Sequence, residues 1–235
     1  MIEIINLHKK FGKLTVLDGL DLKIKKGGIF AILGPNGSGK TTLIKCLLGM
    51  VIPDRGDILL EGKSVLHAAA YRNNINYLPQ IANFPSNLTV TELINMVKNL
   101  RPKPADEKPL VELFGLRPFL KKKLGNLSGG TKQKVNLLLT FMFDSDLIIL
   151  DEPTTGLDPI ALIHLKETIQ QEKEKGKTIL ITTHIMSFVD EMADEIVFLL
   201  DGKIYFKGSV QQLKEQTHES NLEYAIAHLI SKQDA

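Results

Sequence analysis

A short glycine-rich segment that also holds a lysine and a threonine is the part of this sequence best suited to chemistry. The pattern of glycine, any four residues, glycine, lysine, and serine or threonine is met by Gly34, Gly39, Lys40 and Thr41. Glycine reaches backbone angles that strain other residues, so consecutive N–H groups can turn toward one anion. A helix that begins near Gly39 adds the positive end of its dipole. We expect Lys40 to reach the β- and γ-phosphates of a nucleotide and the hydroxyl of Thr41 to hold Mg²⁺.

Two adjacent acids, Asp151 and Glu152, directly follow the apolar run 147–150 and could complete such a site. Ligands of open α/β sheets bind at the carboxyl ends of the strands, so these acids are expected at the same edge as the phosphate loop. Asp151 would help to hold Mg²⁺, and Glu152 could polarise an attacking water. Two acids at a strand end are also common in ordinary loops, and it is the phosphate loop that favours the functional interpretation.

A third segment, Leu127-Ser-Gly-Gly-Thr131, stands just before a predicted helix. Backbone N–H groups of serine and glycine at a helix start can bind an anion. Taken by itself, the segment is better explained as a glycine loop capped by Ser128.

Composition narrows the classes of protein. The 235 residues allow one large domain, and 43% hydrophobic and 24% charged residues are typical of a soluble globular chain. A net charge of +2 gives no electrostatic reason to expect nucleic acid as a partner. The single cysteine, Cys46, suits a reducing compartment and is expected to be a buried small hydrophobe. We expect no signal peptide and no membrane-spanning segment, so a membrane role would need a separate partner chain.

Periodicity predicts an α/β chain. Alternating apolar residues over 1–25 predict antiparallel strands. Apolar runs at 29–33, 147–150, 178–182 and 196–200 alternate with helices, which predicts a mostly parallel sheet covered on both faces. The helix after the phosphate loop is expected to carry an apolar stripe that extends to Val51.

The segment 83–145 has helical character. Thr89-Val-Thr-Glu92 is a capping box, and the helix that follows should end at Arg101-Pro102. Further helices are expected over 106–114 and after Ser128. We therefore predict a cassette over 1–215, with its core at about 1–82 and 146–215 and a helical subdomain at about 83–145.

Two more helices are expected in the last third of the chain. Asp158-Pro159 favours a helix start, with Gly176 just beyond the helix end. Ser220-Asn-Leu-Glu223 forms a second capping-box pattern, and an apolar face from Leu222 to Ile230 follows it. Residues 216–235 are thus predicted to be an amphipathic helix and tail, which packs on the cassette or on a second copy.

The order of these motifs makes the chain resemble the ATP-binding subunits of ATP-binding cassette (ABC) transporters over nearly its full length. The matching segments are the phosphate loop 34–42 (Walker A), Gln80 in the glutamine loop, the signature 127–131, the Walker B strand 147–152, the following loop 156–158 and the switch histidine His184. Each motif except the first is weak alone, and their ordered set is specific. The resemblance implies a P-loop NTPase fold, with a mostly parallel core sheet, antiparallel N-terminal strands and a helical insertion.

The resemblance also implies the roles of individual residues. Glu152, His184 and Gln80 would be catalytic, with His184 on the γ-phosphate, and Thr41, Gln80 and Asp151 would hold Mg²⁺. Phe11 would stack on adenine. The residues implied to bind ATP are Phe11, Val16, Gly34, Pro35, Asn36, Gly37, Ser38, Gly39, Lys40, Thr41 and Thr42 of one copy, and Ser128, Gly129 and Gly130 facing the nucleotide held by a second copy.

The sequence departs from the family pattern at two positions. The signature ends in Thr131 where glutamine is usual, and Lys134 stands where an arginine is usual, which loses a planar bidentate donor. Both acids of the Walker B strand are present. We therefore expect an active ATPase.

The function implied is an ATP-hydrolysing subunit that dimerises around two MgATP and drives a separate integral membrane permease. Such a subunit is cytoplasmic, peripheral on the inner face of the cell membrane, and binds no nucleic acid. Within this family, the chain most resembles the single-domain subunits that serve export-type permeases. Segments 131–135 and 183–187 further resemble the ATPase that supports copper-site maturation of nitrous oxide reductase.

Two alternatives stay open. One is an ABC ATPase of translation or DNA repair that is not tied to transport, although the doubled cassette or long coiled coil of those classes is not predicted here. The other is a P-loop kinase, which the signature segment and His184 argue against.

Overall fold

The fold is built on two β-sheets. The structure is a computed structural model that describes residues 2–66, 69–101 and 103–231. An antiparallel sheet has the order β2-β1-β4-β5, formed by β1 (Ile2–Phe11), β2 (Leu14–Ile24), β4 (Arg55–Leu60) and β5 (Lys63–Ser64). A larger sheet has the order β10-β9-β3-β8-β7-β6, formed by β3 (Gly28–Leu33), β6 (Ile75–Leu78), β7 (Leu147–Asp151), β8 (Thr178–Thr182), β9 (Glu195–Leu200) and β10 (Lys203–Gly208). Its strands run parallel except β10, which confirms the expected mostly parallel sheet.

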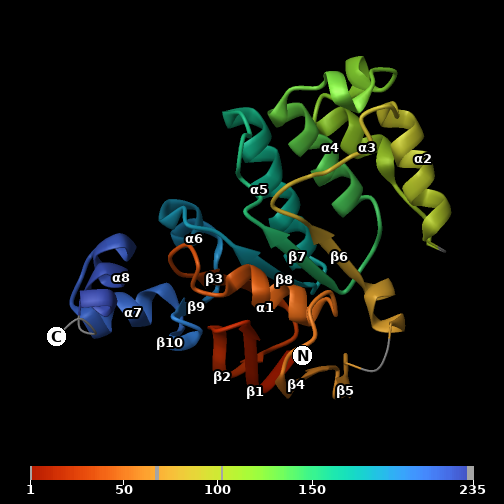
Figure 1. Cartoon of the computed structure of the whole chain (residues 1–235). Helices are drawn as coiled ribbons and strands as arrows, with labels where there is room; N and C mark the ends of the chain where they lie inside the picture. The colour runs from red at the N-terminus through yellow and green to blue at the C-terminus, as the bar shows by residue number, and fades with distance from the viewer. Residues whose placement is uncertain (1, 67–68, 102, 232–235) are drawn as a thin grey trace.

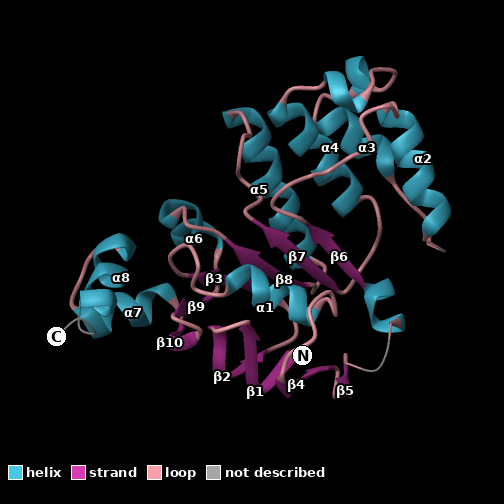
Figure 2. Cartoon of the chain, viewed as in Figure 1, coloured by secondary structure: helices cyan, strands magenta, loops and turns pink. Residues whose placement is uncertain are grey.

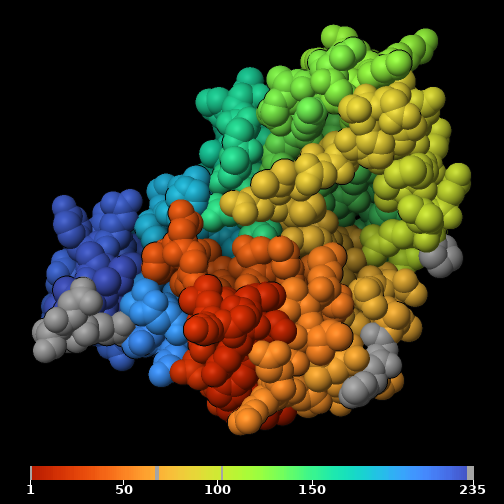
Figure 3. Space-filling view, in the orientation of Figure 1, coloured from red at the N-terminus to blue at the C-terminus, as the bar shows by residue number. Residues whose placement is uncertain are grey.

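Helices lie on both faces of this larger sheet (Figure 1 and Figure 2). In the space-filling view of Figure 3, the C-terminal helices (blue) lie at the left and the helical insertion (yellow to green) at the upper right. The helices are α1 (Lys40–Leu47), α2 (Val90–Leu100), α3 (Glu107–Leu113), α4 (Gly129–Phe141), α5 (Pro159–Glu174), α6 (Met186–Met192), α7 (Val210–Thr217) and α8 (Leu222–Ser231), with short 3₁₀ turns at Ala70–Asn74, Arg117–Phe119 and Leu124–Asn126. The expected stripe to Val51 is too long for α1, because the helix stops before Gly49, whose φ is +65°. Val51 packs against the same apolar core from the loop that follows.

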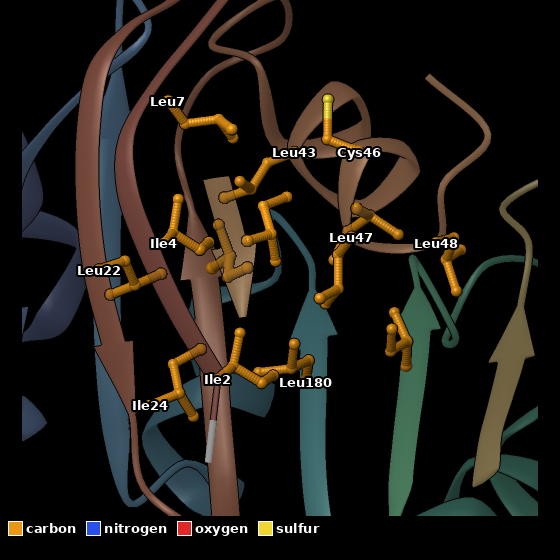
Figure 4. Packing of buried hydrophobic residues seen from close by; sticks show 14 of the residues in the cluster. Ile2, Ile4, Leu7, Leu22, Ile24, Leu43, Cys46, Leu47, Leu48 and Leu180 are labelled. Carbon is orange, nitrogen blue, oxygen red and sulfur yellow. The ribbon is translucent and has the colours of Figure 1, made fainter. Parts of the chain in front are cut away.

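Helix α1 lies between the two sheets. Its apolar residues Leu43, Cys46 and Leu47 are buried in one apolar cluster with residues of both sheets, part of which Figure 4 shows from close by. The prediction that Cys46 is a buried small hydrophobe is confirmed, and burial raises the pKa of its thiol to about 11. The helix that follows the phosphate loop is thus fixed by the main core of the molecule.

The helical insertion packs on the opposite face of the larger sheet and shares an apolar cluster with β7, β8 and α5. The predicted capping box of α2 is present: Glu92 N donates to Thr89 Oγ1 at 3.2 Å, and Thr89 N donates to Glu92 Oε2 at 2.7 Å. A buried polar group ties the insertion to β6. Asn76 Oδ1 accepts from Arg101 Nη1 at 2.7 Å and from Ser145 Oγ at 2.9 Å.

The last two helices cover the edge of the larger sheet formed by β9 and β10. Leu222, Ala225 and Ile226 of α8 are buried in a cluster with those strands and α7, so the predicted apolar face packs on its own chain. The capping box expected at Ser220 is wrong, because α8 begins after Asn221, whose Oδ1 accepts from Glu223 N at 2.6 Å.

The second capping box belongs to α7. Gln212 N donates to Ser209 Oγ at 3.1 Å, and Ser209 N donates to Gln212 Oε1 at 2.8 Å. Residues 232–235 of the predicted tail lie outside the described residues. Within the part of the chain that the structure describes, no helix combines the length and apolarity needed to cross a membrane.

Candidate functional site

One cavity of about 380 Å³ gathers most of the residues that the sequence singled out. It is lined by Phe11, Leu14 and Val16 from β1 and β2, by Asn36, Gly37, Gly39, Lys40, Thr41 and Thr42 from the phosphate loop and α1, by Gln80 after β6, and by Asp151 and Glu152 at the end of β7. Since β3 and β7 are parallel strands of the same sheet, their carboxyl ends deliver the loop and the two acids to one edge.

The phosphate loop depends on glycine at two positions. Gly34 has φ +153°, and a Cβ there would lie 2.0 Å from Leu199 O. Gly39 has φ +105° at the N-cap of α1, and a Cβ there would lie 2.7 Å from Val16 O. Both positions therefore exclude any side chain, for reasons of backbone angle and of space. The loop passes directly into α1, whose first-turn N–H groups have no partner within the helix and are available to an anion.

Lys40 points into the curve of this loop. Its ammonium donates to Gly34 O at 2.7 Å and to Pro35 O at 3.0 Å, and the residue is buried. Burial lowers the pKa of Lys40, and the nearby carboxylates of Glu152 and Asp151 oppose that effect. A cation is thus held between backbone carbonyls and two acids, in the place where phosphate oxygens would enter.

Asp151 carries a carboxylate oxygen suited to a metal ion. Its Oδ1 accepts a short hydrogen bond from Thr182 Oγ1, whereas Oδ2 is buried and has no hydrogen-bond partner among the described residues. The Thr41 hydroxyl and the exposed Gln80 line the same cavity. Oxygen donors of this kind are those that Mg²⁺ prefers, alongside phosphate oxygens. The residues present therefore fit an MgATP site.

Glu152 is held in a backbone conformation that is unusual for glutamate. Its φ is +51°, and its N–H donates to Thr182 O at 2.9 Å. Residues at positive φ other than glycine are strained, and they persist only where the surroundings impose them. The conformation presents the buried carboxylate to the cavity, where His184 Nδ1 lies 3.0 Å from Oε1. His184 is largely exposed and does not itself line the cavity, so Glu152 connects it to the site.

The signature residues lie outside this cavity. Ser128 caps α4, with its Oγ accepting from Thr131 N at 3.2 Å, and Ser128 and Gly129 are exposed. Gly130 abuts the loop after β7, because a Cβ there would lie 2.6 Å from Gly156 O. The structure thus places the signature segment beside the loop after the Walker B strand rather than beside the phosphate loop of the same chain.

Three other predicted residues also fall outside the cavity lining. Gly34 and Ser38 are buried residues of the loop, and Pro35 is exposed on it. Lys134, which stands where an arginine is usual, forms an ion pair with Asp158, with Nζ 2.6 Å from Oδ2. This contact joins α4 to the start of α5.

Two contributors were missed from the sequence. Leu14 is 67% exposed and lines the cavity beside Phe11, which is 51% exposed. An exposed leucine so close to an exposed phenylalanine was the available signal. Thr182 pairs in register with Asp151 across β7 and β8, and it binds both Asp151 and the backbone of Glu152. Only the sheet register reveals that role.

Comparison with known proteins agrees with this geometry. The family model described as "ABC transporter" matches residues 17–155. The Nod factor export ATP-binding protein I of Burkholderia lata is 36% identical over 220 residues, which cover 91% of this chain and 72% of that protein. The lantibiotic transport ATP-binding protein SrtF of Streptococcus pyogenes is 35% identical over 227 residues, which cover 95% of this chain and 94% of that protein.

A solved structure described as an ATP-binding subunit of an ABC transporter has a similar fold along the whole chain. Its TM-score is 0.91 at 29% sequence identity, with 98% of this chain and 99% of that chain covered. The similarity therefore includes the helical insertion and both sheets as well as the segment that the family model matches.

Proposed function

The chain belongs to the ABC transporter family and is an ATPase of that family, and on this premise we propose that it is the ATP-binding subunit of an export-type transporter. In this role two copies close around two MgATP and drive a separate membrane permease. The observation that carries the proposal is the division of the site. The phosphate loop and both acids line one cavity, while Ser128 and Gly129 are exposed at the start of α4, outside it.

Within one copy, each residue of the cavity has a distinct task. Lys40 and the N–H groups of the loop neutralise and orient the phosphates, and Phe11 and Val16 form the adenine platform. Thr41, Asp151 and Gln80 would hold Mg²⁺, which supplies neutralisation of the phosphate charge when it is bound. Glu152 orients the attacking water and accepts its proton, a role that typically contributes 10²- to 10⁴-fold to a rate.

The second half of each site comes from the other copy. The exposed Ser128 and Gly129 offer a hydroxyl and N–H groups at a helix start, which is a suitable anion site. Because they lie outside the cavity of their own chain, a partner is needed to bring them to a γ-phosphate. Bound ATP then holds the two copies together, and hydrolysis of ATP allows the dimer to separate.

Size-exclusion chromatography of the Glu152→Gln variant tests this arrangement. The glutamine keeps size and hydrogen bonding but removes the base, so ATP should bind and remain unhydrolysed. We expect a dimer that requires ATP and that disappears when Ser128→Arg is added. A Glu152→Gln protein that stays monomeric in saturating ATP contradicts dimerisation without the permease, and one that hydrolyses ATP at the normal rate removes Glu152 from the mechanism.

The export direction rests on the two relatives, whose names are Nod factor export and lantibiotic transport ATP-binding proteins. A producing strain that carries Glu152→Gln should retain inside the cell a compound that the wild-type strain releases. A compound that the variant strain fails to accumulate from the medium indicates uptake instead. An unchanged distribution of compounds, with intact ATPase activity in the wild type, favours an ABC ATPase not tied to transport.

A narrower proposal concerns the partner. The segments 131–135 and 183–187 support assignment of the chain to the subgroup that resembles the ATPase of nitrous oxide reductase copper-site maturation. In an organism that has this enzyme, loss of the chain would leave nitrous oxide reductase without its copper site and other copper enzymes intact.

A further inference from the structure

Helix α4 carries two buried amide side chains whose contacts the proposed function does not use. Gln133 is 6% exposed and Asn136 is 4% exposed, and the two lie three residues apart on the helix. Asn136 Nδ2 lies 3.5 Å from Gln133 Oε1, so the amides are neighbours. They sit in a helix whose other buried residues are mostly apolar and belong to the cluster shared with β7 and β8.

Each amide donates to the backbone of a loop that delivers a site residue. Asn136 Nδ2 donates to Pro79 O at 3.1 Å, and Pro79 immediately precedes Gln80. Gln133 Nε2 donates to Pro153 O at 3.1 Å, and Pro153 immediately follows Glu152. Both carbonyls stand just beyond the ends of β6 and β7, where the strand ladders no longer supply partners. One helix therefore fixes both loops at the point where they leave the sheet.

A third buried polar residue of α4 shows what a purely structural contact looks like there. Thr140 is 3% exposed, and its hydroxyl donates to Asn136 O of the same helix at 2.8 Å. That hydrogen bond stays within the helix and reaches neither loop. Asn136 differs because its partner lies 57 positions away in the sequence.

We propose that Asn136 is a positioning residue that clamps the glutamine loop to α4, so that Gln80 and the signature segment at the start of the same helix move as one unit. Gln133 adds the matching contact to the loop after Glu152. A buried amide or carbonyl left without a partner is costly, so the clamp resists separation of the loop from the helix. This inference rests on the proposed roles of Gln80 and Ser128, and it adds the connection between them.

The loop position can be read by fluorescence, since the chain contains no tryptophan. Ile81 follows Gln80 and is 69% exposed, so Ile81→Trp places a single reporter beside the glutamine loop. MgATP added to this protein should change the emission of that tryptophan. We expect Asn136→Leu and the smaller Asn136→Ala to shift the emission before nucleotide is added and to reduce the response to MgATP. Thr140→Val is the matched control, equally buried on the same helix.

Hydrolysis gives the second measurement. Asn136→Ala should lower kcat by about tenfold with nucleotide affinity within twofold of the wild type, because couplings of this kind are worth factors of a few to tens. Thr140→Val should change kcat by less than twofold. In a Gln80→Ala background, Asn136→Ala should lower kcat no further, since it acts through Gln80.

Equal effects of Asn136→Ala and Thr140→Val on emission and on kcat overturn the inference, as does full additivity with Gln80→Ala. A Gln80→Ala variant that hydrolyses ATP at the normal rate contradicts the proposed role of Gln80. In that case the tryptophan at position 81 still decides whether Asn136 holds the loop.

Discussion

The charge of Lys40 should decide whether the chain binds a triphosphate. In the structure the ammonium of Lys40 donates two hydrogen bonds within the loop, to Gly34 O at 2.7 Å and to Pro35 O at 3.0 Å. Each hydrogen bond to a charged partner contributes about 1.5–3 kcal/mol. Two such bonds to phosphate oxygens are worth about 3–6 kcal/mol, or roughly a 10²- to 10⁴-fold change in affinity.

The structure favours the lower end of that range. In the free protein the ammonium already has two carbonyl partners, and binding of ATP must replace or share them. We therefore expect Lys40→Met and Lys40→Ala to weaken ATP binding by about 10²-fold. Adenosine affinity should stay unchanged, since adenosine carries no phosphate for the ammonium of Lys40 to contact.

Equilibrium titration with a fluorescent ATP analogue, with unlabelled adenosine as competitor, measures both effects. Lys45→Met is the matched control, because Lys45 is an exposed lysine in the last turn of the same helix. An unchanged ATP affinity for Lys40→Met refutes the assignment of the phosphate loop. An equal loss for Lys45→Met shows that general charge, rather than the position of Lys40, controls binding.

Three further predictions follow from packing. Gly130→Ala should lower Tm and ATPase activity, because a Cβ at this position would lie 2.6 Å from Gly156 O. A Cβ at Gly129 would meet no atom within 4 Å, so Gly129→Ala should leave Tm unchanged or raise it. Burial raises the pKa of the Cys46 thiol from 9.0 to about 11, so the neutral thiol favours the folded state over the thiolate by roughly 3 kcal/mol. This contribution to the free energy of unfolding is full below pH 9 and is lost as pH rises through 11. In urea titrations across this range, Cys46→Val should therefore lose less stability than the wild type. Deletion of 220–235 should lower Tm by about 10 °C in a thermal scan, since it removes the buried face of α8 and uncovers the cluster beneath it; an unchanged Tm would show that the helix contributes nothing to the fold.

Local signals made much of the fold predictable. The glycine angles of the phosphate loop, the capping box at Thr89 and the start of α5 after Asp158 each depend on residues within one turn of each other. Asp158 does cap α5, with its Oδ1 accepting from Ala161 N at 2.9 Å. The central strands were equally easy to predict from their apolar runs, because both faces of those strands are buried.

Features that depend on distant partners could not be predicted. Strand β6 has four residues, and its identity comes from pairing with β7 far along the chain. Strand β10 buries only Phe206, so its alternation is weak. One local pattern was also misleading: Ser220 fits a capping pattern, but Asn221 one residue later is the acceptor in the structure. The positive φ of Glu152 has no local signal, since it is imposed by β8.

Strand β6 also has a consequence for how the protein folds and opens. It is one of the two edge strands of the larger sheet, and β7 is its one ladder partner among the described strands. Ile75 pairs with Leu147 only after the whole insertion between them has closed, which costs loop entropy and delays pairing. In place of a second ladder, β6 is secured by the side chain of Asn76, which bonds to Arg101 after α2 and to Phe143 and Ser145 near the C-terminal end of that insertion.

Strand and insertion should therefore form one cooperative unit that folds late and exchanges its amide protons early. Hydrogen exchange would show it as a block of weak protection that contains β6 and α2 while β3 and β8 stay protected. The loop that bears Gln80 is thus attached to an edge of the sheet that we expect to open at a low free-energy cost.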